Sequence, residues 1–273
     1  MQLAKIKSIK KLNKKFDRYD LTINKTNNFF ANGILIHNTS CRIANAYVNE
    51  NMGLVKKVLY NFGLYEQKKA NKHLVGTRRV IIERTESGGY YGSHDMYLEV
   101  GEQLQGKLNP GEAIYGEIVG WIDEERPLFN RGGVIFKYGC IEGTRDFYVY
   151  NIKWTLPNGE SIDLPWHKVK ARCEELGLKH VPEVEHNMID QHQDKFEWIS
   201  SFIYGGDPDI LQEIVYPLAE GPDLIDPSHI REGVVVRVDH NGGTKFLKAK
   251  SEKYLTLEDR FKSDNKIDIE ESN

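Results

Sequence analysis

The sequence has few cysteines and no long apolar run. Its three cysteines, Cys41, Cys140 and Cys173, are scattered along 273 residues, which excludes a disulfide framework and a CxxC metal site. No stretch approaches the roughly 20 apolar residues of a membrane-spanning helix, and the basic N-terminus is not followed by the apolar region of a signal peptide. We therefore expect a protein of the reducing cytoplasm with no membrane partner.

Internal repeats and low-complexity linkers are also absent. The chain is 40% hydrophobic and 28% charged, which predicts a soluble protein with one substantial core and a small appendage. The apolar periodicity from residue 39 onward predicts a mixed α+β fold. The expected strands span residues 41–48, 80–84, 113–119, 147–153, 234–238 and 244–250, and the expected helices span residues 95–108, 166–176 and 210–218.

Charge is distributed unevenly along the chain. Residues 1–38 contain eight Lys and Arg against two Asp, a balance of +6, and since the whole chain carries −3, the remaining residues carry −9. A short basic segment before an acidic body can be a nucleic-acid arm or an interface with an acidic partner, although a solvated tail is the more common case. The β-branched, apolar stretches 19–23 and 33–36 favour a segment that pairs with another part of a structure.

Residues 17–40, DRYDLTINKTNNFFANGILIHNTS, resemble the C-terminal splicing blocks of inteins. The similarity lies in the YDL strand, in NFFANGIL and in a terminal His-Asn followed by Thr. It implies a small all-β (Hint-type) intein fragment over residues 1–38. An asparagine can cleave its own C-terminal peptide bond through its side-chain amide, so Asn38 is the expected cleaving residue and His37 its proton-transfer partner. Thr39 would accept the upstream peptide as an ester, and Asp20 matches an acidic position that supports the later steps.

Two further features affect how such a fragment would splice. Asn28, preceded by Asn27, stands where many inteins have a histidine before NF, which removes a proton-transfer group and argues against fast splicing. Met1 lies only 37 residues before Asn38, so we expect the rest of the intein to arrive in trans. The basic balance of residues 1–38 would suit an acidic N-terminal intein fragment as that partner.

Two strand-like segments near the C-terminus carry a charged pattern. Alternation in REGVVVR places Glu232 on the same face as Val234 and Val236, and a carboxylate in line with core residues needs a partner or a ligand. After an Asn-Gly-Gly turn, the returning strand places Lys248 and Lys250 on one face. Two cations on one face can form a phosphate site; the alternative is a solvent-exposed lysine face on an edge hairpin.

Four segments in order resemble motifs III, IIIa, IV and V of the covalent nucleotidyltransferases, in the RNA-ligase branch. They are IYGE at 114–117, DFYVYNI at 146–152, REGVVVR at 231–237 and FLKAKS at 246–251. The resemblance covers about residues 39–255. It implies an ATP-grasp-like adenylyltransferase domain made of antiparallel sheets with flanking helices.

The resemblance also implies roles for individual residues. Glu117 and Glu232 would lie around ATP and its Mg²⁺, Tyr150 would stack on adenine with its π-face, and Lys248 and Lys250 would contact the phosphate. The resemblance therefore gives Glu117 and Lys248 two roles, one in catalysis and one in nucleotide binding.

An arginine and a lysine of this family are harder to place. Arg84 resembles the arginine that meets the bound nucleotide or the nucleic-acid end, with Arg78 and Arg79 as competing candidates. The first motif of the family is K-x-D-G followed by Ser or Thr, and its lysine bonds to AMP. The sequence contains no K-x-D-G, yet it has Thr-Ser-Cys-Arg from Thr39, as expected after that glycine. The intein-like segment therefore interrupts the nucleotide-binding motif between Gly and Thr.

These observations predict protein trans-splicing that creates an ATP-dependent RNA ligase. A partner would supply the K-x-D-G lysine and the N-terminal intein half. The spliced enzyme would take up AMP and seal the 5′-phosphate and 3′-hydroxyl ends of RNA, whereas the unspliced chain would not take up AMP. The expected units are residues 1–38, the ligase domain 39–255 and a polar tail 256–273.

Two other functions remain open from the sequence. One is a DNA ligase of minimal type. The other is a non-catalytic module that binds a nucleotide or nucleic acid and retains a degenerate intein scar. Only 23 residues follow Lys250, fewer than the OB-fold that usually follows in DNA ligases and capping enzymes, which favours an RNA ligase.

Overall fold

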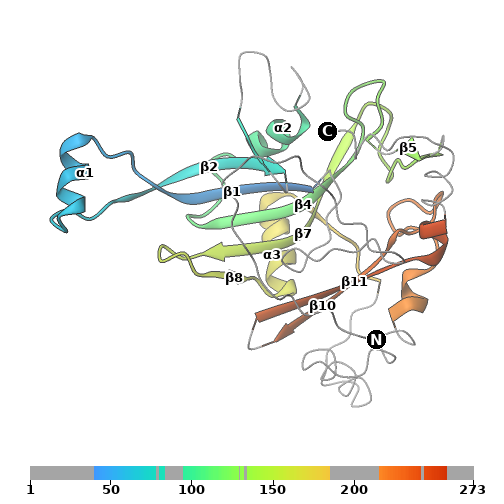
Figure 1. The fold of residues 1–273 in the computed structure, drawn as a ribbon. Helices are drawn as coiled ribbons and strands as arrows, with labels where there is room; N and C mark the ends of the chain where they lie inside the picture. Colours follow the sequence, from blue (N-terminus) through green and yellow to red (C-terminus); the bar gives the residue numbers. More distant parts are fainter. Residues whose placement is uncertain are drawn as a thin grey trace, which may run out of the picture.

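The computed structural model describes residues 40–77, 80–83, 95–128, 130–131, 134–184, 215–240 and 243–256. Within these residues, a seven-stranded sheet forms the main body, two further pairs of strands lie beside it, and the named helices are α1 Leu54–Asn61, α2 Met96–Gln103 and α3 Trp166–Leu176 (Figure 1). None of the described helices has the length and apolar character needed to span a bilayer.

The main sheet is antiparallel apart from one short parallel pair. Its strands follow the order β3-β2-β1-β4-β7-β8, and β9 pairs with β7 in parallel. Their bounds are β1 Ser40–Asn49, β2 Lys69–Thr77, β3 Ile81–Ile82, β4 Glu112–Gly120, β7 Arg145–Thr155, β8 Ser161–Asp163 and β9 Lys179–His180. The other pairs are β5 Asn130–Arg131 with β6 Val134–Ile135, and β10 Gly233–His240 with β11 Gly243–Lys250.

One face of the main sheet forms the hydrophobic core. Cys41 and Ile43 of β1, Ile114 of β4, and Val149 of β7 are fully buried and pack in one cluster with residues of α2 and α3. Because strand side chains alternate between faces, the opposite face of β1 and β4 carries polar residues, among them Ser40. The core therefore orients a polar face away from α2 and α3.

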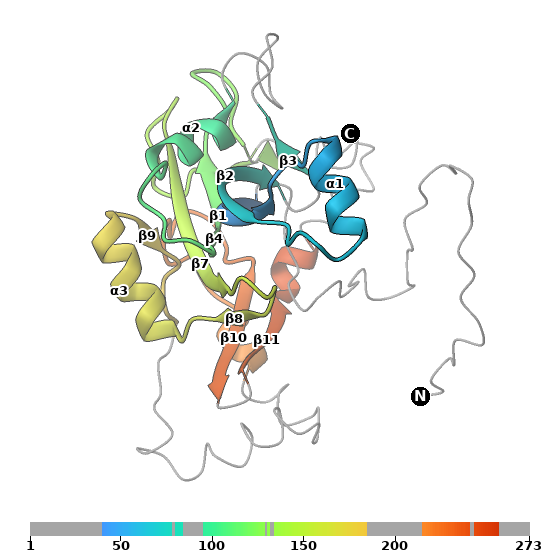
Figure 2. The same cartoon turned by 90° about the vertical axis from the view of Figure 1, so that its left-hand side faces the viewer.

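The β10–β11 hairpin lies beside β8 and is fixed to β7 through one arginine (Figures 1 and 2). Arg237 of β10 donates to the side-chain oxygen of Asn151 at 3.1 Å and pairs with Asp239 at 3.0 Å. Its guanidinium also lies over the rings of Trp166 and Phe246, at 5.5 and 5.2 Å from their centroids. These contacts hold the hairpin in one position relative to the main sheet.

Most expected elements are confirmed, and α3 spans the same residues as the helix expected at 166–176. The helix expected over 95–108 is shorter, because α2 begins after Asp95, which caps it by accepting from the amides of Tyr97 and Leu98, and ends at Gln103. Only Ile81–Ile82 is a strand in the described part of 80–84. Residues 215–218 of the helix expected at 210–218 are helical, the helix continues to Ala219, and residues 210–214 lie outside the described part.

The sequence did not predict helix α1 or the long strand β2 that follows it. It also did not predict the β5–β6 pair or the short strands β8 and β9. The mixed sheet with few helices agrees with the α+β class. The all-β intein fragment expected over residues 1–38 lies outside the described residues.

Candidate functional site

A cluster of three charged side chains lies on the β10–β11 hairpin. Lys248 and Lys250 project from the same face of β11, and Glu232 directly precedes β10. The Nζ of Lys248 lies 2.8 Å from Oε1 of Glu232, and that of Lys250 lies 4.0 Å from the same oxygen. The side chains of Lys248 and Lys250 are only 16% and 13% exposed, which excludes a solvent-exposed lysine face. The two lysines therefore converge on one carboxylate, with Lys248 within charge-assisted hydrogen-bond distance.

An aromatic cluster, which consists of Phe136, Tyr138, His229 and Tyr254, supports these charged residues. The Nζ of Lys250 lies 5.6 Å from the centroid of the Tyr254 ring, a cation–π distance. The Tyr254 ring meets Phe136 edge-on at 6.2 Å, and Phe136 lies 4.7 Å from His229. Tyr254 and Phe136 are 4% and 2% exposed. This packing restricts where the ammonium of Lys250 can move.

Tyr138 adopts a backbone conformation that L-residues rarely use. Its φ is +49°, and it is the one residue other than glycine with positive φ among those described. It lies in a turn closed by a 3.0 Å bond from the amide of Cys140 to the carbonyl of Lys137. Its ring packs edge-on against His229 at 4.9 Å. A retained conformation of this kind costs about 1–3 kcal/mol and is found preferentially at functional sites.

The surroundings of Tyr138 connect the hairpin to the main sheet. Burial raises the pKa of the Tyr138 phenol well above its usual value, and the nearby carboxylates of Glu232 and Glu117 raise it further. The phenol of Tyr138 therefore stays protonated at neutral pH.

The polar face of the main sheet forms the other side of the site. Ser40 of β1 is directly opposite Glu117 of β4, so both side chains project from one face. A register shift between Tyr115 and Gly116 brings Tyr150 of β7 to the same place, where its hydroxyl lies 3.0 Å from Oγ of Ser40. Burial raises the pKa of Tyr150, Ser40 partly counteracts this as a hydrogen-bond partner, and the charge of Glu117 adds to the increase.

The structure describes five residues of the expected ligase site and places them on the main sheet and on the hairpin that Arg237 ties to it. Glu117 and Tyr150 come from the main sheet, Glu232, Lys248 and Lys250 from the hairpin. The nucleotide-contacting arginine expected at Arg84, its competitors Arg78 and Arg79, and the splicing residues Asp20, His37, Asn38 and Thr39 lie outside the described residues.

The carboxylates fit a hard cation that shares its ligands with a phosphate. The described residues contain no group of three or more His, Cys, Asp or Glu side chains that could hold a metal by themselves. Glu117 and Glu232 could supply one carboxylate each, because Mg²⁺ is commonly bound through one or two carboxylates together with substrate phosphates and water.

Sequence reasoning missed three contributors to this site. Ser40 was read only as a residue that follows a missing motif, and its bond to Tyr150 joins positions 110 residues apart. Tyr138 has no sequence signal beyond the glycine that follows it. Arg42, two residues beyond Ser40, donates through Nε and Nη2 to the carbonyl of Thr77 at 2.9 and 2.6 Å and so ties β1 to the end of β2.

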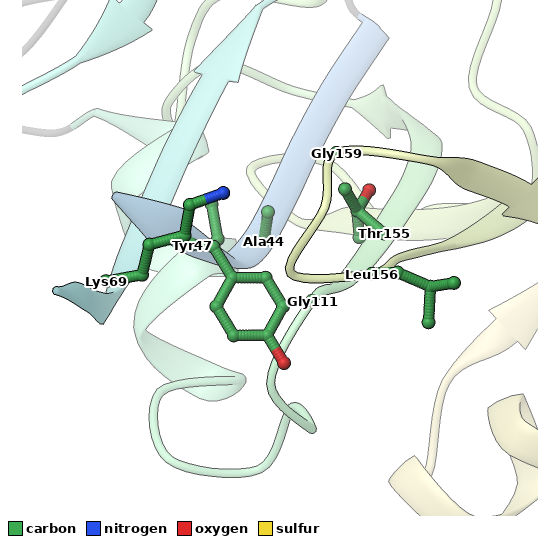
Figure 3. Close-up of a pocket in the computed structure, with 9 residues that line it drawn as sticks. Ala44, Tyr47, Lys69, Gly111, Thr155, Leu156 and Gly159 are labelled. Atoms are coloured by element: carbon green, nitrogen blue, oxygen red, sulfur yellow. The ribbon is translucent and has the colours of Figure 1, made fainter. Parts of the chain in front are cut away.

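A separate cavity of about 150 Å³ lies further along β1 (Figure 3). It is lined by Ala44 and Ala46 of β1, by Tyr47 and Lys69, and by residues around Gly111 and Thr155. None of the five ligase-site residues lines it. Its volume is below the roughly 300 Å³ at which pockets begin to hold a ligand of nucleotide size.

Residues 59–250 match the family model for RNA ligases, and the chain therefore belongs to the RNA ligase family. Among solved structures it is similar to the RNA ligase of Naegleria gruberi. An apo mutant of that protein shares 18% identity at a TM-score of 0.44, over 83% of this chain and 50% of that one. A mutant with ATP and Mn shares 18% identity at a TM-score of 0.45, over 84% of this chain and 51% of that one.

The chain spans about half the length of these solved structures. No curated protein matches it.

Proposed function

We propose that residues 39–255 form the nucleotide-binding domain of an ATP-dependent RNA ligase. The observation that carries this proposal is the convergence of Lys248 and Lys250 on Glu232, in a hairpin that Arg237 ties to the strand of Tyr150. Membership of the RNA ligase family supports the same function. RNA rather than DNA is the proposed substrate for that reason.

Each residue has a role that follows from its chemistry. Tyr150 offers a π-face to adenine, and the Ser40 hydroxyl holds the phenol of Tyr150 in place. Lys248 and Lys250 stabilise the charge that develops on the α-phosphate during transfer. Glu117 and Glu232 are the carboxylates for Mg²⁺, which would offset negative charge on the phosphates when bound.

The reaction needs a nucleophilic lysine, which the K-x-D-G motif would supply. Its neutral amine attacks the α-phosphorus of ATP, pyrophosphate leaves, and the amine nitrogen loses a proton as the P–N bond forms. An oxygen of an RNA 5′-phosphate then attacks the phosphorus of the bound AMP. A P–O bond forms, the P–N bond breaks, and the leaving lysine nitrogen takes up a proton. A 3′-hydroxyl attacks that 5′-phosphate, forms the phosphodiester bond and releases AMP.

The position of Ser40 supports a junction with K-x-D-G directly before Thr39. β1 begins at Ser40, and Ser40 contacts Tyr150 inside the proposed nucleotide site. A lysine four residues before Thr39 would enter the site from the same edge of the sheet. Residues 17–39 support protein splicing as the way this junction forms, with Asn38 as the cleaving residue, His37 and Asp20 as helpers, and Thr39 as the acceptor.

Sealing of RNA by the joined protein tests the ligase proposal. A chain in which Lys-x-Asp-Gly directly precedes Thr39 should join a 5′-phosphate RNA end to a 3′-hydroxyl end, and the K248A variant should do so about 10²- to 10³-fold more slowly. Sealing of DNA ends but not of RNA ends would favour the DNA ligase alternative. Tight ATP binding without any sealing would favour the non-catalytic module.

Mass spectrometry tests splicing separately. The chain is mixed with a partner that carries K-x-D-G followed by an N-terminal intein half. The expected product has lost residues 1–38 and carries Thr39 bonded to the glycine of the partner, and the N38A variant should not form it. An unchanged mass after mixing would mean that residues 1–38 do not splice with that partner.

A further inference from the structure

The tip of the β1–β2 hairpin projects from the body of the protein. Figure 1 shows both strands extending past the other strands of the main sheet, with α1 at their end. No residue of α1 is buried. Leu54, Phe62 and Leu64 are 84%, 75% and 74% exposed, so this end of the hairpin presents a large contact surface. We refer to residues 49–73 as the hairpin tip.

The hairpin tip is a basic part of an acidic body. It contains five lysines against two glutamates, a balance of +3, whereas residues 39–273 together carry −9. The rest of that body therefore carries −12. Since phosphate contacts dominate nucleic-acid affinity, an acidic RNA-binding protein needs a local basic surface of this kind. The lysines of the tip are Lys56, Lys57, Lys68, Lys69 and Lys72.

Aromatic side chains lie among these lysines. Phe62 and Tyr60 are 75% and 48% exposed, and the Nζ of Lys56 lies 5.5 Å from the centroid of the Tyr65 ring. Exposed rings interspersed with cations are the recurring surface for single-stranded nucleic acid, because the bases stack on the rings while the backbone follows the charges. A purely charged surface would not need the rings.

One strand connects the hairpin tip to the nucleotide site. β1 begins at Ser40, which contacts Tyr150, and ends at Asn49 in the tip. Its ten residues span about 30 Å at 3.3 Å per residue. The cavity of Figure 3 lies between the two, where Ala44 and Ala46 carry small side chains and Lys69 reaches the carbonyl of Pro157.

We propose that the hairpin tip binds the single-stranded part of the RNA substrate, about 30 Å from the junction that is sealed. The RNA backbone would follow β1 from the nucleotide site and reach the tip after about nine nucleotides, at 3.4 Å per nucleotide of a stacked strand. This inference rests on the proposed function, because it assigns a place to the RNA of that reaction.

Fluorescence anisotropy with labelled RNA of about 6 and about 20 nucleotides tests the inference on the full chain. The K56E/K57E variant should bind the longer RNA more weakly and with a shallower salt dependence, since each lost phosphate contact removes about 0.7 from the logarithmic slope for single strands. F62A should weaken it roughly 5- to 150-fold, the loss of one stacked base. The short RNA cannot span from the nucleotide site to the tip, so both variants should reduce its affinity less than that of the longer RNA.

A control variant has the same change in charge elsewhere. K107E/K168E alters two exposed lysines near α2 and in α3 and should bind the longer RNA with nearly wild-type affinity. Equal weakening by both double variants would mean that only net charge matters, and it would contradict a defined RNA path.

Variants of the exposed apolar residues of α1 test whether the tip binds a protein instead of RNA. If L54S/V55S abolishes self-association of the chain in sedimentation while K56E/K57E and F62A bind RNA normally, the tip is a protein interface and the inference is wrong. AMP uptake by the joined protein is measured in the same variants and should be normal. If the wild-type joined protein took up no AMP, the proposed function would be wrong. The RNA affinities of the variants would still show whether the tip binds RNA.

Discussion

Ser40 and Tyr150 lie 110 residues apart in the sequence, and their hydroxyl oxygens lie 3.0 Å apart in the structure. The contact joins the first residue of β1 to the middle of β7 and fixes the tyrosine that we assign to adenine. Because Ser40 is the second residue after Asn38, any change at the proposed splice junction would act directly on the nucleotide site.

Loss of either hydroxyl should therefore affect ATP binding more than turnover. S40A and Y150F in the joined protein should each raise the KM for ATP about 2- to 12-fold, which corresponds to a hydrogen bond worth about 0.5–1.5 kcal/mol. The rate of AMP uptake at saturating ATP should change little. Steady-state kinetics over a range of ATP concentrations measures both.

The double variant S40A/Y150F should show no further increase in KM, since both changes remove the same bond. Y47F serves as the control, because Tyr47 lies on β1 like Ser40 but lines the separate cavity. Additive effects of S40A and Y150F would mean that the two hydroxyls do not act through each other.

The pair Lys248–Glu232 should matter more for chemistry than for folding. K248A removes a cation from the proposed phosphate site and should lower AMP uptake about 10²- to 10³-fold. Its Glu232 partner stays in contact range of Lys250, so the cost in unfolding free energy should stay at about 1–3 kcal/mol. Urea denaturation and AMP uptake of K248A and K248R separate the two effects. Full activity of K248A would remove this lysine from the mechanism.

A buried ion pair at the first residue of β4 should be important for stability. The Glu112 side chain is 0% exposed and accepts from Nε and Nη2 of Arg172 at 2.8 and 2.9 Å, and from the amide of Asn109 at 2.8 Å. R172A leaves this carboxylate buried without its cation and should cost about 3–5 kcal/mol. Urea unfolding monitored by circular dichroism gives the value.

K170A is the matched control for R172A on the same helix. Lys170 pairs with Glu183 at 3.0 Å, and both side chains are about one third exposed. Its removal should cost at most about 1 kcal/mol. Equal losses in the two variants would mean that burial of Glu112 does not set the energy of its ion pair.

Stability should fall at alkaline pH because buried thiols and phenols would have to ionise. Burial raises the pKa of Cys140 and of Cys173 from 9.0 to about 11, and it raises that of Tyr150. The folded state holds these protons more tightly than the unfolded state, so the stabilisation is complete below pH 9 and is lost as pH rises from about 9 through 11. Urea midpoints at pH 8 and pH 10.5 measure the loss, and C173S should reduce it. A midpoint that does not change over this range would contradict the assignment.

Local signals made parts of the fold predictable from the sequence. α3 is bounded by Pro165 before its first residue and by Gly177, which takes the left-handed conformation after its last, and both residues are strong boundary signals. The β10–β11 hairpin was equally clear from its turn and its alternation. β2 was missed because its sequence KANKHLVGT is largely polar, and its strand conformation depends on pairing with β1.

In the candidate site, too, some residues could be predicted from local motifs and others only from the structure. Glu117, Glu232 and the two lysines of β11 could be found because each sits in a short motif that resembles a known family. Tyr138 could not be found, because its left-handed turn and its packing against His229 depend on elements that are distant in the sequence. The role of Ser40 was hidden for the same reason.

Transfer of label from α-labelled ATP to protein shows whether the K-x-D-G lysine is the nucleophile. We expect covalent AMP on a protein in which Lys-x-Asp-Gly precedes Thr39 and no label on the 273-residue chain alone, since the latter has no K-x-D-G lysine. Covalent AMP on the unjoined chain would mean that another residue is the nucleophile and that the proposed junction is not needed.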